Sequence, residues 1–417
     1  MSTLSLASHL GRTRLGKIAD GLAVAVAVSL PWSTSATGIL LVPWLIALTP
    51  TLEWSELRRQ LNTAAGGLPV LLFLLGALGM IWADVSWHAR LGGIDGFVRL
   101  LTVPLLMAQF RRSDGGQRVL IGFFGACVAL LIASVIVKIW PSLHPTGDPG
   151  VPVKSYIVQS LEFVMCAAVL LDLCLAKARA RQWTMAAAFG ALALAFLGDV
   201  LFVTTGRTAL VVLPALIVVY GFRQAGWKGI VGAGIAVAVL AAIVWTTSSY
   251  VRERVTGIYT ETENYEQAND ATSSGLRLAF WQKSIDIIRR APLIGHGTGT
   301  IVDEFRRATA GQSGADAVAS ANPHNQTFAV GIQLGLLGIA VLWAMWIAQL
   351  LYFRGGGLVA WAGLVVVTAN IVGSLFNSFI FDFTEGWIYV FGVGVIAGMV
   401  QRQNAGRHGN AAVSPDP

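Results

Sequence analysis

The sequence has little charge. Only 12% of its 417 residues are Asp, Glu, Lys or Arg, whereas 55% are hydrophobic. Ordinary soluble domains carry about 25% charged residues. The apolar residues also come in long runs, such as residues 229–247 and 358–375. Runs of this length cross a bilayer as helices, because no water inside the bilayer can satisfy an exposed backbone. The shortage of charge therefore excludes an ordinary soluble protein.

Cysteine and the common cofactor motifs are also scarce or missing. The three cysteines, Cys127, Cys166 and Cys174, all fall inside apolar runs, with a spacing that resembles neither a disulfide framework nor a metal site. No Asp-x-Asp, Walker, Rossmann or His-Glu-x-x-His pattern occurs. We therefore predict no metal and no cofactor.

The apolar runs predict an all-α polytopic membrane protein with about 12 transmembrane helices. With an even number of spans, both termini share a side of the membrane. The predicted spans lie near residues 21–33, 36–50, 67–83, 96–110, 119–140, 156–176, 184–204, 208–222, 229–247, 326–352, 356–378 and 387–400.

The distribution of positive charge gives the orientation. If both termini are cytoplasmic, most Lys and Arg lie in cytoplasmic tails and loops, and the short outer loops hold only Arg90, Lys154 and Arg207. This is the positive-inside pattern. The net charge of +7 thus reflects topology, and no nucleic-acid partner is expected. The first apolar run is followed at once by another, so we expect a pair of spanning helices rather than a cleaved signal peptide.

The predicted organisation has four parts. Residues 1–247 form transmembrane helices 1–9, and residues 248–325 form a periplasmic loop domain. Residues 326–400 form transmembrane helices 10–12, and residues 401–417 form a disordered cytoplasmic tail. The expected location is the cell inner membrane, with the working site facing the periplasm.

The long loop is the informative part of the chain, because a polar stretch of this size is typical of a functional segment. Residues 253–270 are acidic and predict a solvated segment. Residues 276–291 predict an amphipathic helix, with Leu278, Trp281, Ile285 and Ile288 on its apolar stripe. A second short helix is predicted over residues 301–310.

Three residues are candidates for chemistry. His324 lies in a Pro-His-Asn turn where the chain re-enters the membrane, and it can accept a proton near neutral pH; the alternative is a helix-capping histidine. Arg207 lies in a polar turn between two apolar runs, where it can fork onto phosphate or simply reach lipid headgroups. Arg277 lies near the start of the amphipathic helix, which favours an anion; the alternative is a solvated surface arginine.

These motifs together resemble the O-antigen ligase family, within the superfamily that includes O-antigen polymerases and bacterial O-oligosaccharyltransferases. His324-Asn325 is followed after nine residues by Gly335-Leu336-Leu337-Gly338, as in the family's signature. Ile339 stands where the family often has Thr or Tyr. The Gly206-Arg207-Thr208 turn, the Arg277 and Trp281 pair, and Pro292-Leu293-Ile294-Gly295-His296-Gly297 match its other motifs.

The resemblance implies an O-antigen ligase that transfers a glycan from undecaprenyl diphosphate to a lipid A–core hydroxyl at the outer face of the inner membrane. It implies His324, Arg207 and Arg277 as catalytic residues, with metal-independent inversion at the anomeric carbon. The two arginines, Asn325, and Arg289 or Arg290 would contact substrate. An O-antigen polymerase or a protein O-oligosaccharyltransferase fits the same motifs, and a secondary transporter is a reading of a different class.

Overall fold

A computed structural model describes residues 3–144, 148–204 and 206–411. Within these residues the chain forms helices and no strand, which confirms the all-α polytopic prediction. Up to the loop, the helices are α1 (Thr3–Ser29), α2 (Thr34–Leu48), α3 (Trp54–Leu61), α4 (Ala64–Trp82), α5 (Trp87–Val98), α6 (Thr102–Arg112), α7 (Gly116–Ile139), α8 (Tyr156–Arg179), α9 (Trp183–Phe202) and α10 (Arg207–Thr247). The loop forms α11 (Ser249–Ala268), α12 (Ser273–Arg290) and α13 (Ile301–Thr309), and the chain ends with α14 (Gln326–Tyr352), α15 (Leu358–Gly373) and α16 (Phe383–Ala411).

The apolar helices agree with a multi-pass membrane protein. Among the described residues, nine helices are long and apolar enough to cross a membrane, and α15 is a shorter apolar helix. Two of the predicted spans, 208–222 and 229–247, both belong to α10. This helix of 41 residues is interrupted by non-helical backbone at Ala225 and Gly226. A count of long helices therefore gives a lower number than a count of apolar runs.

The two arms of α10 fold back on each other at this break. Gly226 has a φ of 58°, in the left-handed region that glycine adopts readily. A Cβ at Gly229 would lie 1.7 Å from the carbonyl oxygen of Gly221, so only glycine allows the arms to approach this closely. Leu210 and Leu240, one from each arm, pack against a common apolar cluster. The hairpin returns the chain to the end of the molecule where α10 began.

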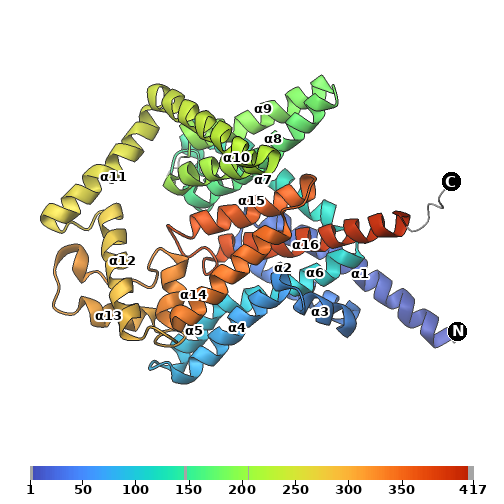
Figure 1. The fold of residues 1–417 in the computed structure, drawn as a ribbon, viewed down its shortest axis with the longest axis horizontal. Coiled ribbons are helices and arrows are strands. Elements are labelled where there is room, and N and C mark those ends of the chain that lie inside the picture. Colours follow the sequence, from blue (N-terminus) through green and yellow to red (C-terminus); the bar gives the residue numbers. More distant parts are fainter. Residues whose placement is uncertain (1–2, 145–147, 205, 412–417) are drawn as a thin grey trace.

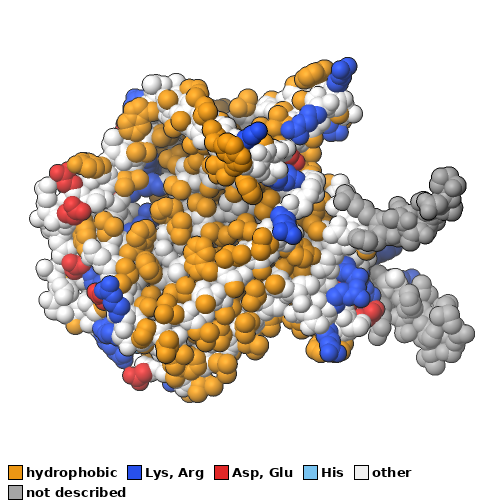
Figure 2. All heavy atoms as spheres, in the orientation of Figure 1, with side chains coloured by type: hydrophobic (Ala, Val, Ile, Leu, Met, Phe, Trp, Pro, Cys, Tyr) orange, Lys and Arg blue, Asp and Glu red, His pale blue; other side chains and the backbone are white. Residues whose placement is uncertain are grey.

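The helices place the loop and the termini at opposite ends (Figure 1). Both termini lie at one end, whereas α11, α12 and α13 lie at the other. Figure 2 shows a broad apolar surface between these ends and most charged side chains at the ends themselves. Which end faces the periplasm rests on the positive-inside pattern and stays a prediction.

The loop differs from its prediction in two respects. The acidic stretch 253–270, predicted only as a solvated segment, is largely the helix α11. Its side chains are mostly exposed, because it has no apolar stripe to bury. Helix α12 forms as predicted, but its buried residues are Ser274, Gly275, Ala279, Phe280, Ser284 and Ile287. Ile285, assigned to the stripe from the sequence, is 39% exposed.

The reason for the shifted stripe is the packing of α12. Phe280 and Ile287 form one apolar cluster with Phe305 of α13 and Ile332 of α14, and this contact sets the rotation of the helix. The predicted short helix over 301–310 forms as α13. The predicted tail begins as a continuation of α16, which runs to Ala411, and residues 412–417 lie outside the described part of the chain.

Candidate active site

His324 is fixed in an unusual backbone conformation at the start of α14. Its φ is 52°, which is uncommon for a residue with a side chain and costs free energy. Its backbone N–H donates to Asn322 Oδ1 at 2.8 Å. Its ring stacks on Phe280, with ring centroids 5.9 Å apart and planes 15° apart. The backbone contact fixes the turn, and the stack on Phe280 of α12 restricts the orientation of the imidazole.

Asn377 determines which nitrogen of His324 is available. His324 Nδ1 lies 3.0 Å from Asn377 Oδ1, and this oxygen also accepts from Asn322 Nδ2 at 2.8 Å. Because the amide oxygen is an acceptor, Nδ1 carries the proton and Nε2 keeps its lone pair. Burial, together with the positive charge of Arg277, lowers the pKa of His324. The imidazole is therefore neutral at pH 7 and can accept a proton at Nε2.

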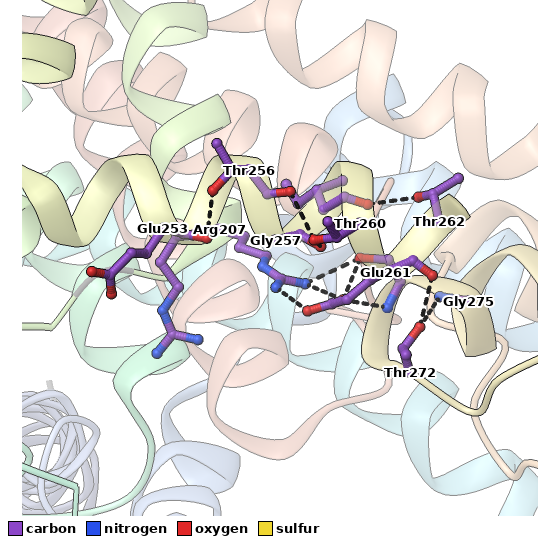
Figure 3. A network of polar contacts seen from close by, with 12 residues as sticks. Arg207, Glu253, Thr256, Gly257, Thr260, Glu261, Thr262, Thr272 and Gly275 are labelled. Carbon is purple, nitrogen blue, oxygen red and sulfur yellow. Dashed lines mark hydrogen bonds and ion pairs between the residues drawn. The ribbon is translucent and has the colours of Figure 1, made fainter. Parts of the chain in front are cut away.

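Arg207 lies at the first residue of α10 and pairs with α11. Its Nη1 and Nη2 donate to the two carboxylate oxygens of Glu261 at 3.0 Å and 2.6 Å (Figure 3). Nη1 also donates to Ser274 Oγ at 3.1 Å. Ser274 donates both its backbone N–H and its hydroxyl to Glu261. These contacts, led by the bond from Arg207, lower the pKa of Glu261 to about 2. The carboxylate therefore stays charged and fixes the arginine.

The pairing leaves one edge of the Arg207 guanidinium without a hydrogen-bond partner among the described residues. An arginine has five N–H donors, and the contacts with Glu261 and Ser274 use three of them. The Nε atom is buried and has no hydrogen-bond partner in the described residues. Nε–H and the second Nη2 hydrogen form a fork of the kind that suits a phosphate. An unpartnered buried donor calls for an explanation, and a bound anion supplies one.

A buried network behind Arg207 holds its turn in place. Thr204 Oγ1 donates to Asp199 Oδ1 at 2.5 Å, and Ser134 Oγ donates to Asp199 Oδ2 at 2.5 Å. Gly206 then caps α10 directly before Arg207. Thr205, which belongs to the predicted turn, lies outside the described residues. The network ties the start of α10 to the ends of α9 and α7.

Arg277 joins the other two candidates on one face of α12. Ser274 contacts Arg207, and Trp281 donates to the backbone oxygen of His324 at 3.4 Å. Arg277 lies between these positions, and the spacing of three and four residues puts all three on one helix face. At 1.5 Å per residue, the seven residues from Ser274 to Trp281 span about 10 Å. Two of the three predicted catalytic residues, Arg207 and His324, thus contact the same two turns of the helix that carries the third, Arg277.

Arg277 itself is a half-buried cation without a close acidic partner. Among the described residues it forms no hydrogen bond and no ion pair. Burial, followed by the charge of Arg207, lowers its pKa, but the guanidinium remains charged at neutral pH. Because Glu261 offsets Arg207, Arg277 gives the site its uncompensated positive charge.

The other residues predicted to contact substrate, Asn325, Arg289 and Arg290, are engaged in contacts within the protein. Asn325 caps α14: its Oδ1 accepts from Phe328 N at 3.2 Å, and its Nδ2 donates to the Leu375 carbonyl at 3.1 Å. Arg289 is exposed and pairs with Asp286, and Arg290 pairs with Glu304. The structure thus brings neither Arg289 nor Arg290 to Arg277, because they are 12 and 13 residues along α12, about 18 Å away.

The residues that position the three candidates have no local signal in the sequence. Glu261 was one of several acids in a solvated stretch, and nothing in its local pattern singles it out. Asn322 and Asn377 carried no signal either, because their role depends on contacts across more than 50 residues of sequence. Only the polar character of the segment before His324 hinted at a network there.

Comparison with known proteins adds one finding. Residues 190–343 match a protein family described as O-antigen ligase. The match contains Arg207, Arg277 and His324. The match supports the resemblance to the O-antigen ligase family that the motifs indicate. No curated protein matches the chain.

Proposed function

We propose that this O-antigen ligase family member transfers a glycan from undecaprenyl diphosphate to a hydroxyl of lipid A–core at the periplasmic face of the inner membrane. The observation that carries the proposal is the convergence of Arg207, Arg277 and His324 on one face of α12. Two arginines can bind the oxygens of a diphosphate, and a neutral histidine can accept the proton of a hydroxyl. A transporter has no need of this arrangement at the end of the helix bundle, since transporters bind near the bilayer midplane.

The arginines bind the leaving group in this proposal. The open fork of Arg207 takes one phosphate, and Arg277 takes the same or the neighbouring phosphate. Both remain charged throughout the reaction, so they stabilise the negative charge that grows on the diphosphate. Glu261 acts as a positioning residue, because it holds Arg207 without touching the donor.

His324 accepts the proton of the acceptor. The acceptor oxygen forms a bond to the anomeric carbon of the donor while the bond between that carbon and the diphosphate oxygen breaks. The hydroxyl proton goes to His324 Nε2, and the electron pair of the broken bond leaves with undecaprenyl diphosphate. A single displacement of this kind inverts the anomeric configuration.

The test is a reconstituted transfer reaction. Purified protein in lipid is given a defined undecaprenyl diphosphate glycan and purified lipid A–core, and the His324→Ala variant runs beside it. We expect glycosylated lipid A–core from the wild type and at least about 100-fold slower formation by the variant. A deletion strain separates the superfamily alternatives: carrier-linked polymer with free core supports a ligase, and a single-repeat cap supports a polymerase.

A further inference from the structure

A basic cavity lies at the end of the helix bundle that is far from the candidate active site. Helix α14 begins beside His324 and has 27 residues, so about 40 Å of helix separates its two ends. The cavity opens at the far end, between α8, α10 and the loop that joins α14 to α15. Its volume is about 470 Å³, within the range of about 300–1,000 Å³ that is usual for small-molecule sites. Its lining includes Asp172, Arg179, Arg223, Gln224, Arg354 and Gly357.

Arg223 is held in place in the wall of this cavity. Its Nη2 donates to the Gly357 carbonyl at 2.7 Å, and its Nη1 lies 3.7 Å from Asp172 Oδ1. The guanidinium lies over the Trp361 ring, 5.6 Å from the ring centroid. Only 13% of the Arg223 side chain is exposed. These contacts join α10 to α8 and to the start of α15, so the position of this positive charge is set by the fold.

The lining carries more positive charge than the protein pairs. It holds three arginines and one aspartate, so its formal charge is +2. Asp172 lies beside Arg223 and also accepts from the Tyr220 hydroxyl at 3.1 Å. The side chains of Arg179 and Arg354 form no hydrogen bond and no ion pair among the described residues. An anion in the cavity would give both of them a partner, because an arginine binds phosphate oxygens through paired N–H groups.

The surroundings place the cavity at the depth of lipid headgroups. Helix α9 begins at Trp183, directly after α8, and Trp227 follows the break in α10. These two side chains are 67% and 69% exposed, and exposed tryptophans are typical of the headgroup layer of a membrane. Phe222, next to Arg223, is also exposed and offers apolar surface beside the cavity. Figure 2 shows Lys and Arg side chains at this end, next to the broad apolar surface. This combination favours an anion that is anchored in the membrane over a soluble one.

We propose that this cavity binds the headgroup of an anionic phospholipid from the leaflet opposite the candidate active site. The phosphate accepts hydrogen bonds from Arg179, Arg223 and Arg354, and the acyl chains lie along the apolar surface beside Phe222. The bound lipid joins α8, α10 and the loop before α15 through one phosphate. This site takes no part in the proposed transfer reaction and does not depend on it.

The test measures the affinity of the first lipid that binds to the purified protein in detergent, by native mass spectrometry. Phosphatidylglycerol is the anionic probe and phosphatidylcholine the zwitterionic one, and inorganic phosphate is added as a soluble competitor. The variant combines Arg179→Gln with Arg354→Gln, because these exposed side chains have no partner in the described part of the protein, and it keeps Arg223. The matched control combines Arg58→Gln with Arg59→Gln. These two arginines of α3 are also exposed and unpaired among the described residues, and they do not line the cavity.

We expect the wild type and the control to bind phosphatidylglycerol more tightly than phosphatidylcholine. The Arg179→Gln, Arg354→Gln variant should bind phosphatidylglycerol at least about tenfold more weakly than the control, which corresponds to about 1.4 kcal/mol, with phosphatidylcholine binding unchanged. Equal phosphatidylglycerol affinity in the two double variants overturns the inference. Displacement of the lipid by inorganic phosphate at a similar concentration also overturns it, because the site would then take a soluble anion. Either failure leaves the proposed transfer reaction standing, since no glycan donor or acceptor is present in this test.

Discussion

Replacing Arg207 by lysine tests whether its free edge binds the donor. Lysine keeps the positive charge but has one nitrogen in place of the planar fork. That nitrogen can bond to Glu261, as Arg207 does at 2.6 Å and 3.0 Å, but it cannot offer a second, parallel pair of N–H groups to a phosphate. The variant therefore keeps the positive charge at this position and removes only the planar pair of N–H groups.

The size of the effect follows from the two donors that are lost, Nε–H and one Nη2 hydrogen. A hydrogen bond to a charged group contributes about 1.5–3 kcal/mol. Lysine recovers part of this through its charge, so we expect a net loss of about 2–3 kcal/mol in transition-state stabilisation. This corresponds to a decrease of about 30- to 150-fold in kcat/KM for the donor.

The assay is transfer to lipid A–core with the donor concentration varied and the acceptor saturating. Arg252→Lys is the control, because Arg252 is a half-buried arginine of α11 whose side chain, among the described residues, bonds only to the backbone oxygens of Trp245 and Thr246. We expect wild-type kinetics from this control. Wild-type kcat/KM in Arg207→Lys would refute the role assigned to the open fork.

Four further predictions concern the rest of the site. His324→Ala should lower kcat by about 10²–10⁴-fold, the usual contribution of a general base, and unchanged kcat would remove it from the mechanism. Asn377→Asp should move the acid limb of the rate–pH profile to higher pH, because a carboxylate stabilises the protonated imidazole; an unmoved limb would contradict the contact. Glu261→Gln should speed amide exchange at Ser274, which donates its N–H to that carboxylate at 2.9 Å, and unchanged exchange would argue against a fixed pair. Transfer should persist in EDTA, because arginines supply the positive charge, and complete loss in chelator would argue for a metal.

Hydropathy predicted most of the helices, because the bilayer imposes the same requirement on every spanning segment. The turn at Gly226 was visible as a gap between two apolar runs. The rotation of α12 was not, since Phe280 and Trp281 are both large and apolar. Only the contact with Phe305 and Ile332 decides which of them is buried.

The candidate catalytic residues could be predicted from the sequence, but the residues that hold them in position could not. Arg207, Arg277 and His324 stand out because each carries charge or a titratable ring at a motif position. Glu261 and Asn377 act through contacts with residues more than 50 positions away, at Arg207 and His324. Local sequence patterns do not record such contacts, so these residues emerge only from the fold.

The proposed reaction requires that the two arginines and the histidine serve one reaction centre. A structure of the protein with bound undecaprenyl diphosphate tests it most directly. We expect a phosphate oxygen within hydrogen-bond distance of Arg207 Nε, Arg277 on the same diphosphate, and the glycan side of the diphosphate toward His324 Nε2. A diphosphate bound away from both guanidinium groups would contradict it.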